Sequence, residues 1–172
     1  MYIRNLIGTG GAENIIQISL YLPLSSIWHF DAMEDGKMTS KAIVFSSGLG
    51  KTRKIAEYVG KGLKADVFDL KKQSTINLSE YKHIIFGTGI HAGKPYGALV
   101  EFLDKNKAQL SGKKTSLFLS CMHNEEKGEA QLKRVSGELG ISDAFFFAGK
   151  GEKNEEGVEK SIDAFIAEMQ KR

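Results

Sequence analysis

Five short apolar runs, separated by longer stretches of helical spacing, are the feature that most limits how this chain can fold. Residues 42–45 form a continuous apolar run, which is typical of a strand buried on both faces. Residues 65–70 alternate like a half-covered strand, and further strand-like runs lie at 83–87, 115–119 and 144–148. Between the runs, apolar residues recur at helical spacing, as at Ile55, Val59 and Leu63. Strands that alternate with helices predict a parallel sheet with helices on both faces.

We therefore expect an α/β fold, a three-layer, doubly wound sandwich around a five-stranded parallel sheet in the order 2-1-3-4-5. Residues 38–172 contain all of the runs without an interdomain linker, so we interpret them as one domain. The phenylalanines at 145–147 are expected in the core, because they form one of the predicted buried strands. Glutamates between 152 and 159 surround the start of the last helix, where they suit its dipole, and we expect no chemistry from them.

Residues 1–37 do not share this pattern, and we expect them to form an N-terminal extension outside the fold. The apolar run at 15–24 is too short and too interrupted to cross a membrane. Glu13 precedes the run and no small-residue cleavage site is present, which argues against a signal peptide. A further hypothesis is a mis-assigned start, with translation beginning at Met38, because codons for residues 33–35 can contain a ribosome-binding sequence.

Cysteine content and charge limit the environment and the partners of the chain. The single cysteine, Cys121, excludes an intramolecular disulfide and an all-cysteine metal site, and it suits a reducing, cytoplasmic location. The formal net charge is +3, and the basic residues are spread along the chain instead of clustered. We therefore expect no nucleic-acid partner.

The loops to inspect for function follow the first, third and fourth predicted strands. In an open parallel sheet, ligands bind beyond the carboxyl ends of the strands, at the point where the strand order reverses. The loops at this place are 46–52, 88–95 and 120–124. The first two contain no carboxylate and are rich in glycine, hydroxyl groups and lysine. This chemistry favours an anionic ligand.

The first loop predicts an anion cradle of phosphate size. A short glycine turn that runs into a helix presents free N–H groups and the positive end of the helix dipole to one point. Ser47 and Thr52 add hydroxyl donors, and Lys51 adds charge. The alternative is that Gly48 and Gly50 only shape a tight turn between strand and helix.

Three other kinds of phosphate site require residues that this chain lacks. The Gly-Lys-Thr segment is similar to the end of a P-loop, but Phe45 occupies the leading glycine position. A dinucleotide fingerprint needs a third glycine where Arg53 stands. A phospho-acceptor receiver domain needs acidic residues where this chain has Ser46, Ser47 and Thr88.

Residues 45–56 resemble the FMN-phosphate signature of flavodoxins, with Ser47, Gly50 and Thr52 on its positions. Leu49 departs from it, since most flavodoxins have a hydroxyl residue there. Residues 81–93 are similar to the corresponding stretch of flavodoxin-type, quinone-dependent protoporphyrinogen oxidases. The resemblance extends over about residues 40–170 and implies a flavodoxin-like fold with FMN as the cofactor.

The resemblance also implies which residues contact FMN. The phosphate contacts would come from the first loop: Ser46, Ser47, Gly48, Leu49, Gly50, Lys51 and Thr52. One side of the flavin ring would be lined by Thr88, Gly89, Ile90, His91 and Ala92, and the other side by Cys121, Met122 and His123. No residue is expected to act as a general acid or base, because the flavin itself does the redox chemistry. No metal site is expected, because neither loop histidine pairs with the cysteine at ligand spacing.

Three functions remain open at this point. The first is an oxidoreductase that moves electrons between a small molecule, such as an anionic porphyrinogen, and a quinone or other acceptor; the positive charge suits an anionic substrate or an anionic membrane surface. The second is an electron carrier that docks to protein partners. It is supported because the long extra segment of the oxidases has no room between Cys121 and Lys150, but the positive charge opposes it, since classical flavodoxins are strongly acidic, and the oxidoreductase remains the first hypothesis. The third is a flavin-free interaction module, supported by Leu49 and by Ala92, which stands where an aromatic residue is common.

Overall fold

The computed structural model describes residues 40–121, 125–149 and 151–172, and the side chains of all of these except Cys121 and Glu125. The predicted extension at 1–37 and the predicted flavin neighbours Met122 and His123 lie outside the described residues.

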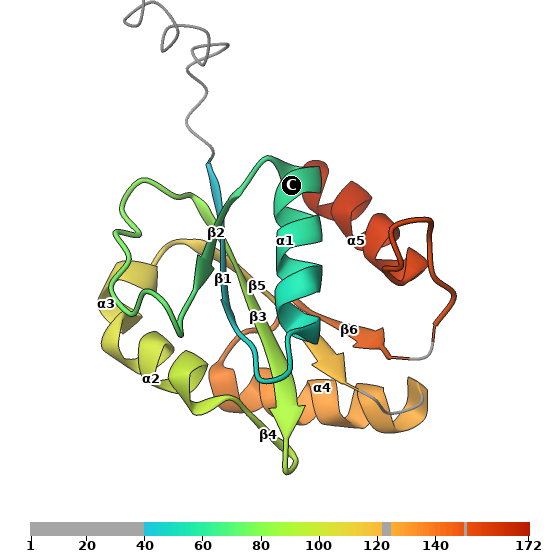
Figure 1. Ribbon diagram of the computed structural model, residues 1–172. Coiled ribbons are helices and arrows are strands. Elements are labelled where there is room, and N and C mark those ends of the chain that lie inside the picture. The colour runs from blue at the N-terminus through green and yellow to red at the C-terminus, as the bar shows by residue number, and fades with distance from the viewer. Residues whose placement is uncertain (1–39, 122–124, 150) are drawn as a thin grey trace, which may run out of the picture. The chain divides into compact units, whose positions relative to one another are not determined.

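A parallel sheet forms the centre of the described chain (Figure 1). Its strands are β1 (Lys41–Ser46), β2 (Asp66–Asp69), β3 (His83–His91), β5 (Lys114–Cys121) and β6 (Ala144–Ala148). Neighbouring strands are parallel, and the order is β2-β1-β3-β5-β6. Counted over these five strands alone, this is the predicted order 2-1-3-4-5. The predicted α/β fold is therefore confirmed.

A short antiparallel hairpin extends one strand beyond the prediction. β3 continues to His91, and β4 (Lys94–Pro95) folds back to pair with its end. The turn between them consists of Ala92 and Gly93, both with a positive φ, of 47° and 78°. Two central residues with positive φ match the twist of a two-residue hairpin turn.

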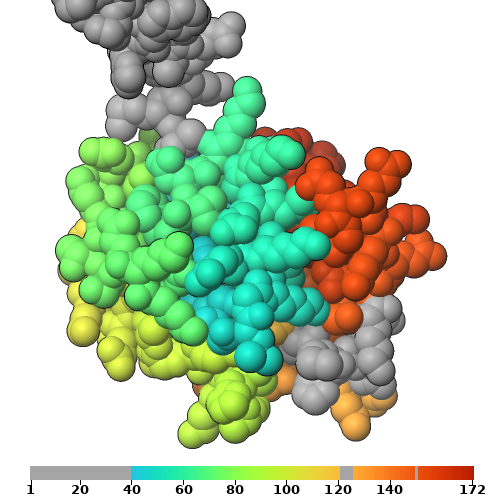
Figure 2. All heavy atoms as spheres, in the orientation of Figure 1, coloured from blue at the N-terminus to red at the C-terminus, as the bar shows by residue number. Residues whose placement is uncertain are grey.

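Helices cover both faces of the sheet, as Figure 1 shows. α1 (Lys51–Leu63) and α5 (Lys160–Gln170) lie side by side on one face (Figure 2). α2 (Gly97–Lys105), α3 (Lys107–Leu110) and α4 (Glu125–Leu139) pack on the other. A hydrophobic core lies on each face of the sheet, and alternate residues of β1 point into one or the other. Ile43 and Phe45 face α1 and α5, whereas Ala42 and Val44 face α2 and α4. This double burial explains why the strand is apolar at consecutive positions.

The phenylalanines of β6 correct one expectation. Phe147 is buried, but Phe145 and Phe146 are only partly buried. β6 is the last strand of the sheet and pairs only with β5 in the described chain, so its side chains have neighbours on fewer sides than those of a central strand.

The strand register brings the predicted loops to one edge of the sheet. Ser46 at the end of β1 pairs with Thr88 of β3, and Gly89 pairs with Ser120 of β5. The carboxyl ends of these three strands therefore meet.

Among the residues that the structure describes, no helix is both long and apolar enough to span a bilayer.

Candidate functional site

A cavity of about 370 Å³ opens where the carboxyl ends of β1, β3 and β5 meet. Its volume lies in the range of small-molecule sites. It is lined by Ser47, Gly48, Leu49, Lys51, Thr52, Gly89, Ile90, Ala92, Gly93, Tyr96 and Ser120. The structure thus brings together most of the predicted residues from the first two loops. Ser46 and Thr88 are buried in the strand ends next to this cavity, and Gly50 lines a neighbouring cavity.

The start of α1 presents unpaired hydrogen-bond donors at this cavity. Gly50 is the N-cap residue, with a left-handed φ of 90° that favours glycine, and no side chain caps the helix. Within the described residues, the N–H groups of Lys51, Thr52 and Arg53 have no backbone acceptor. The Gly50 N–H donates to the Ser47 Oγ at 3.2 Å, which holds the turn in shape. An uncapped helix start with free N–H groups is an anion site by its electrostatics.

Thr52 adds a hydroxyl to these donors. The residue is 3% exposed, and within the described part of the chain its hydroxyl makes no hydrogen bond. Leu49, in contrast, is fully exposed, so its side chain points away from the donors and only its backbone can serve them. The arrangement can hold a small oxyanion such as a phosphate, because N–H and O–H groups donate to several of its oxygens.

The charged residues of the loop are already paired. The Lys51 ammonium lies 3.2 Å from a carboxylate oxygen of Glu159, just before α5. The Arg53 guanidinium donates to Asp69 at the end of β2, at 2.7 Å. The charge that the sequence places on Lys51 is therefore balanced by a partner from the last loop of the chain.

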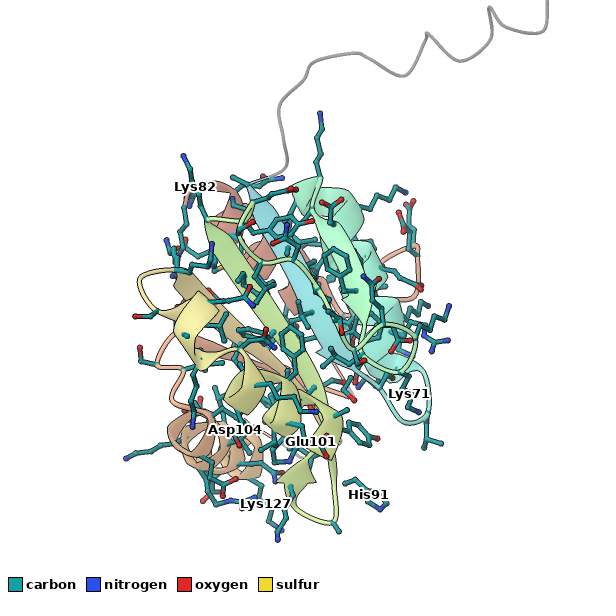
Figure 3. The ribbon with its side chains drawn as sticks, turned by 90° about the vertical axis from the view of Figure 1, so that its left-hand side faces the viewer. Lys71, Lys82, His91, Glu101, Asp104 and Lys127 are labelled. Atoms are coloured by element: carbon teal, nitrogen blue, oxygen red, sulfur yellow. The ribbon has the colours of Figure 1, made fainter. Side chains whose placement is uncertain are left out.

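The hairpin forms another wall of the site and is tied to α4. The Gly93 carbonyl accepts a hydrogen bond from Gln131 Nε2 at 3.1 Å and another from Arg134. His91 is exposed near the end of this hairpin, as Figure 3 shows. Its ring stacks on that of Tyr96, with 6.5 Å between the centroids.

Tyr96 lines the cavity but was not among the site residues predicted from the sequence. A side-chain carbon on Gly48 would overlap the Tyr96 hydroxyl, and one on Gly89 would lie 3.0 Å from its ring. The backbone N–H of Tyr96 donates to Thr88 Oγ1 at 3.2 Å. Tyr96 thus lies between the first loop and the end of β3. The signal that could have placed it is the Ala-Gly turn, which folds the chain back over the cavity.

The strongly perturbed titratable groups lie at the opposite end of the sheet. His83 Nε2 and Ser116 Oγ are 2.7 Å apart, and the same hydroxyl donates to Asp143, which also accepts from Arg172 at 2.6 Å. Burial, with nearby lysines, lowers the pKa of His83 to about 4. This group contains a serine, a histidine and an aspartate, but Ser116 is 0% exposed. It cannot act as a nucleophile on a ligand from solution.

In the described residues, no group of three or more histidine, cysteine or carboxylate side chains could hold a metal ion. The backbone of Cys121 ends β5 at the edge where the cavity opens. The expected contacts of Cys121, Met122 and His123 with a ligand stay predictions.

Comparison with known proteins settles the family. Residues 42–171 match the family model described as the flavodoxin domain. The chain belongs to the flavodoxin domain family. This flavodoxin domain is 30% identical, over 126 residues, to an uncharacterized protein of Methanocaldococcus jannaschii, covering 64% of this chain and 84% of that protein.

Solved structures share the fold of this flavodoxin domain. Oxidised flavodoxin 1 from Bacillus cereus is 26% identical, with a TM-score of 0.56, over 77% of this chain and 97% of that one. A Fusobacterium nucleatum flavodoxin bound to flavin mononucleotide is 15% identical, with a TM-score of 0.52, over 76% and 96%. Rubredoxin oxygen:oxidoreductase from Desulfovibrio gigas is 17% identical, with a TM-score of 0.56, over 77% of this chain. The flavodoxin domain spans 36% of the length of that oxidoreductase.

Proposed function

We propose that this flavodoxin-family chain binds FMN and uses it to transfer electrons. The observation that carries the proposal is the uncapped start of α1 beside a cavity of about 370 Å³. Free N–H groups and a hydroxyl at one point match the oxygens of a phosphate. The Fusobacterium flavodoxin, which shares the fold, has flavin mononucleotide bound. The isoalloxazine of FMN supplies the redox chemistry, while the protein positions it and tunes its potential.

The residues around the start of α1 have the donors that a phosphate needs. Ser47 shapes the turn, and the N–H groups of 51–53 with the Thr52 hydroxyl would hold the phosphate. The hairpin with Ile90 and Ala92, together with Tyr96, offers a largely apolar wall for the ring. Because Leu49 points into solvent, its side chain would add nothing to the phosphate contacts.

The Thr52→Val variant tests this assignment, because it removes the hydroxyl and keeps the shape. Loss of a hydrogen bond to a charged group costs about 1.5–3 kcal/mol, so we expect FMN affinity to fall by about tenfold or more. Riboflavin lacks the phosphate, and its affinity should not change. Quenching of flavin fluorescence measures both affinities.

Thr75→Val is the matched control for that variant. Thr75 is exposed in the segment between β2 and β3, and we expect it to bind FMN like the unmodified protein. A wild-type chain that stays colourless in excess FMN contradicts the proposal and favours the flavin-free interaction module.

The finer part of the proposal is an oxidoreductase that acts on a small molecule, with a quinone or another acceptor. Its support is the net charge of +3, which suits an anionic substrate, and the resemblance of 81–93 to flavodoxin-type protoporphyrinogen oxidases. A porphyrinogen with carboxylate side chains is the substrate to test first.

An electron carrier is the second candidate, and the chain between β5 and the last loop favours it. α4 and β6 occupy most of the chain from Glu125 to Ala148, which leaves no room there for an extra segment of the kind that the oxidases carry. Turnover of protoporphyrinogen with a quinone supports the oxidoreductase. Rapid reduction by a flavodoxin reductase, without such turnover, supports the carrier.

A further inference from the structure

Lys51 lies between two cavities. It lines the cavity of the proposed phosphate site and also a neighbouring cavity of about 440 Å³, which includes Gly50, Val158 and Glu159. The start of α1 and the loop before α5 lie side by side on this face of the molecule (Figure 2). The Lys51 ammonium can therefore serve a ligand on one side or a carboxylate on the other.

Glu159 is the carboxylate that holds this ammonium. Its side chain is only 6% exposed, whereas that of Lys51 is 38% exposed, and the two are 3.2 Å apart. Glu159 is also the N-cap residue of α5, where the helix dipole favours a negative charge. Within the described residues, Lys51 is the one cation that forms an ion pair with it.

The loop that presents Glu159 is internally fixed. Asn154 Oδ1 accepts hydrogen bonds from the N–H groups of Glu156 and Val158, at 3.1 and 3.0 Å. The backbone of Glu159 forms an antiparallel β-bridge with that of Lys153 across the loop. The nearby Lys54 ammonium contacts the Gly157 carbonyl at 3.3 Å. These contacts fix the backbone that carries Glu159, and its carboxylate lies beside Lys51.

Moving Lys51 to a bound phosphate would leave this carboxylate buried and without a cation. Removing one partner of a buried ion pair is strongly unfavourable, because the remaining charge is uncompensated. A phosphate on the other side of the loop offers Lys51 a new partner but does not restore water to Glu159. The Lys51–Glu159 ion pair is therefore more favourable than a contact of Lys51 with the phosphate.

We propose that Glu159 is a positioning residue that keeps Lys51 out of the phosphate cradle, so that the N–H and O–H donors of residues 51–53 alone recognise the phosphate. This inference rests on the proposed FMN site. It assigns a specificity role to a glutamate that the sequence attributes only to the helix dipole. The cradle is then close to neutral before the ligand binds.

The Glu159→Gln variant tests the inference. It frees Lys51 for the phosphate, and one added charge-assisted hydrogen bond corresponds to an increase in FMN affinity of about tenfold. Riboflavin affinity should stay the same, and FMN binding should become more sensitive to salt, because a new charge pair is screened. Glu152→Gln is the matched control: Glu152 lies on the same loop and pairs with Lys160 instead. It should bind both flavins like the wild-type chain.

The double variant K51M/E159Q gives an independent reading if Glu159→Gln alone does not fold. It removes both charges, so the inference predicts FMN affinity close to that of the wild-type chain. A loss of about tenfold in the double variant shows that Lys51 contacts the phosphate directly and overturns the inference.

An unchanged or lower ratio of FMN to riboflavin affinity in Glu159→Gln also overturns it. A wild-type chain that binds neither flavin contradicts the proposed function itself, and the inference then fails with it. If the wild-type chain binds FMN normally but the variants give either of these contrary results, the inference alone has failed and the proposed function stands.

Discussion

At the scale of single residues, close packing at the end of β3 depends on glycines that leave room for aromatic rings. A side-chain carbon on Gly87 would overlap the ring of Phe118, which is 0% exposed and packs against Phe147 and Phe165. The next residue, Thr88, belongs to the end of β3 that borders the site. The position of this strand end is therefore coupled to a small residue in the core beneath it.

The Gly87→Ala variant should destabilise the fold by about 1–3 kcal/mol, the usual cost of overpacking a dense core. Urea unfolding measures the difference. Gly137→Ala is the control, because Gly137 lies in α4 with open space around it, and alanine there should be neutral or stabilising by about 0.5–1 kcal/mol. Equal stability of both variants would contradict the packing described for Phe118.

The site residues differ in whether a short stretch of sequence is enough to predict them. Ser47, Gly50 and Thr52 follow one strand and precede one helix, so a short stretch of sequence was enough to predict an anion cradle. The partner of Lys51 comes from Glu159, more than a hundred positions later, and no local pattern predicts that contact. Tyr96 was also missed, because its place depends on a hairpin that the spacing of apolar residues does not show.

At the scale of secondary-structure elements, β1 is continuously apolar because both of its faces are buried, whereas β2 alternates because it is a partly exposed edge strand of the described sheet. From such patterns the five parallel strands were predictable. The pairing of β4 was not, since it has two residues, one of them a proline, and pairs only with the end of β3. Its turn places Ala92 at a positive φ, which is uncommon for a residue other than glycine. Contacts of Gly93 with α4 support this turn.

The Arg134→Met variant should loosen the hairpin, because it removes a hydrogen bond to the Gly93 carbonyl. With one such bond worth about 0.5–1.5 kcal/mol, amide exchange in the turn should become about two- to tenfold faster. Lys133→Met, an exposed change at the preceding position on α4, is the control. Unaltered exchange in Arg134→Met would show that the helix does not hold the turn.

At the scale of the whole domain, the two edges of the sheet differ in chemistry. The carboxyl edge has the uncapped helix start and the cavity, whereas the amino edge has the buried network of His83, Ser116 and Asp143. The network fixes residues from β3, β5 and the turn before β6. We assign the network a stabilising role, because Ser116 is inaccessible to a ligand.

Stability should fall in mild acid because of His83. The pKa of this buried histidine is lowered to about 4 in the folded chain, from an ordinary value of 6.5. The unfolded chain therefore binds the proton first, and stability is lost as the pH falls from about 6.5 toward about 4. Between neutral pH and about pH 4.5, the loss should be about 2–3 kcal/mol.

Urea unfolding at several pH values measures this loss. His83→Gln should remove most of the pH dependence in that window, whereas the exposed control His91→Gln should retain it. A wild-type slope that persists in His83→Gln would assign the effect to other groups.

The central claim is that the N–H and O–H donors at the start of α1 hold the phosphate of FMN. Phosphorus NMR of FMN bound to the wild-type chain tests this claim most directly. We predict one bound resonance, shifted from that of free FMN, that does not titrate between about pH 6 and 8, because the donors stabilise the doubly charged form. A phosphate resonance that titrates like that of free FMN would contradict the account.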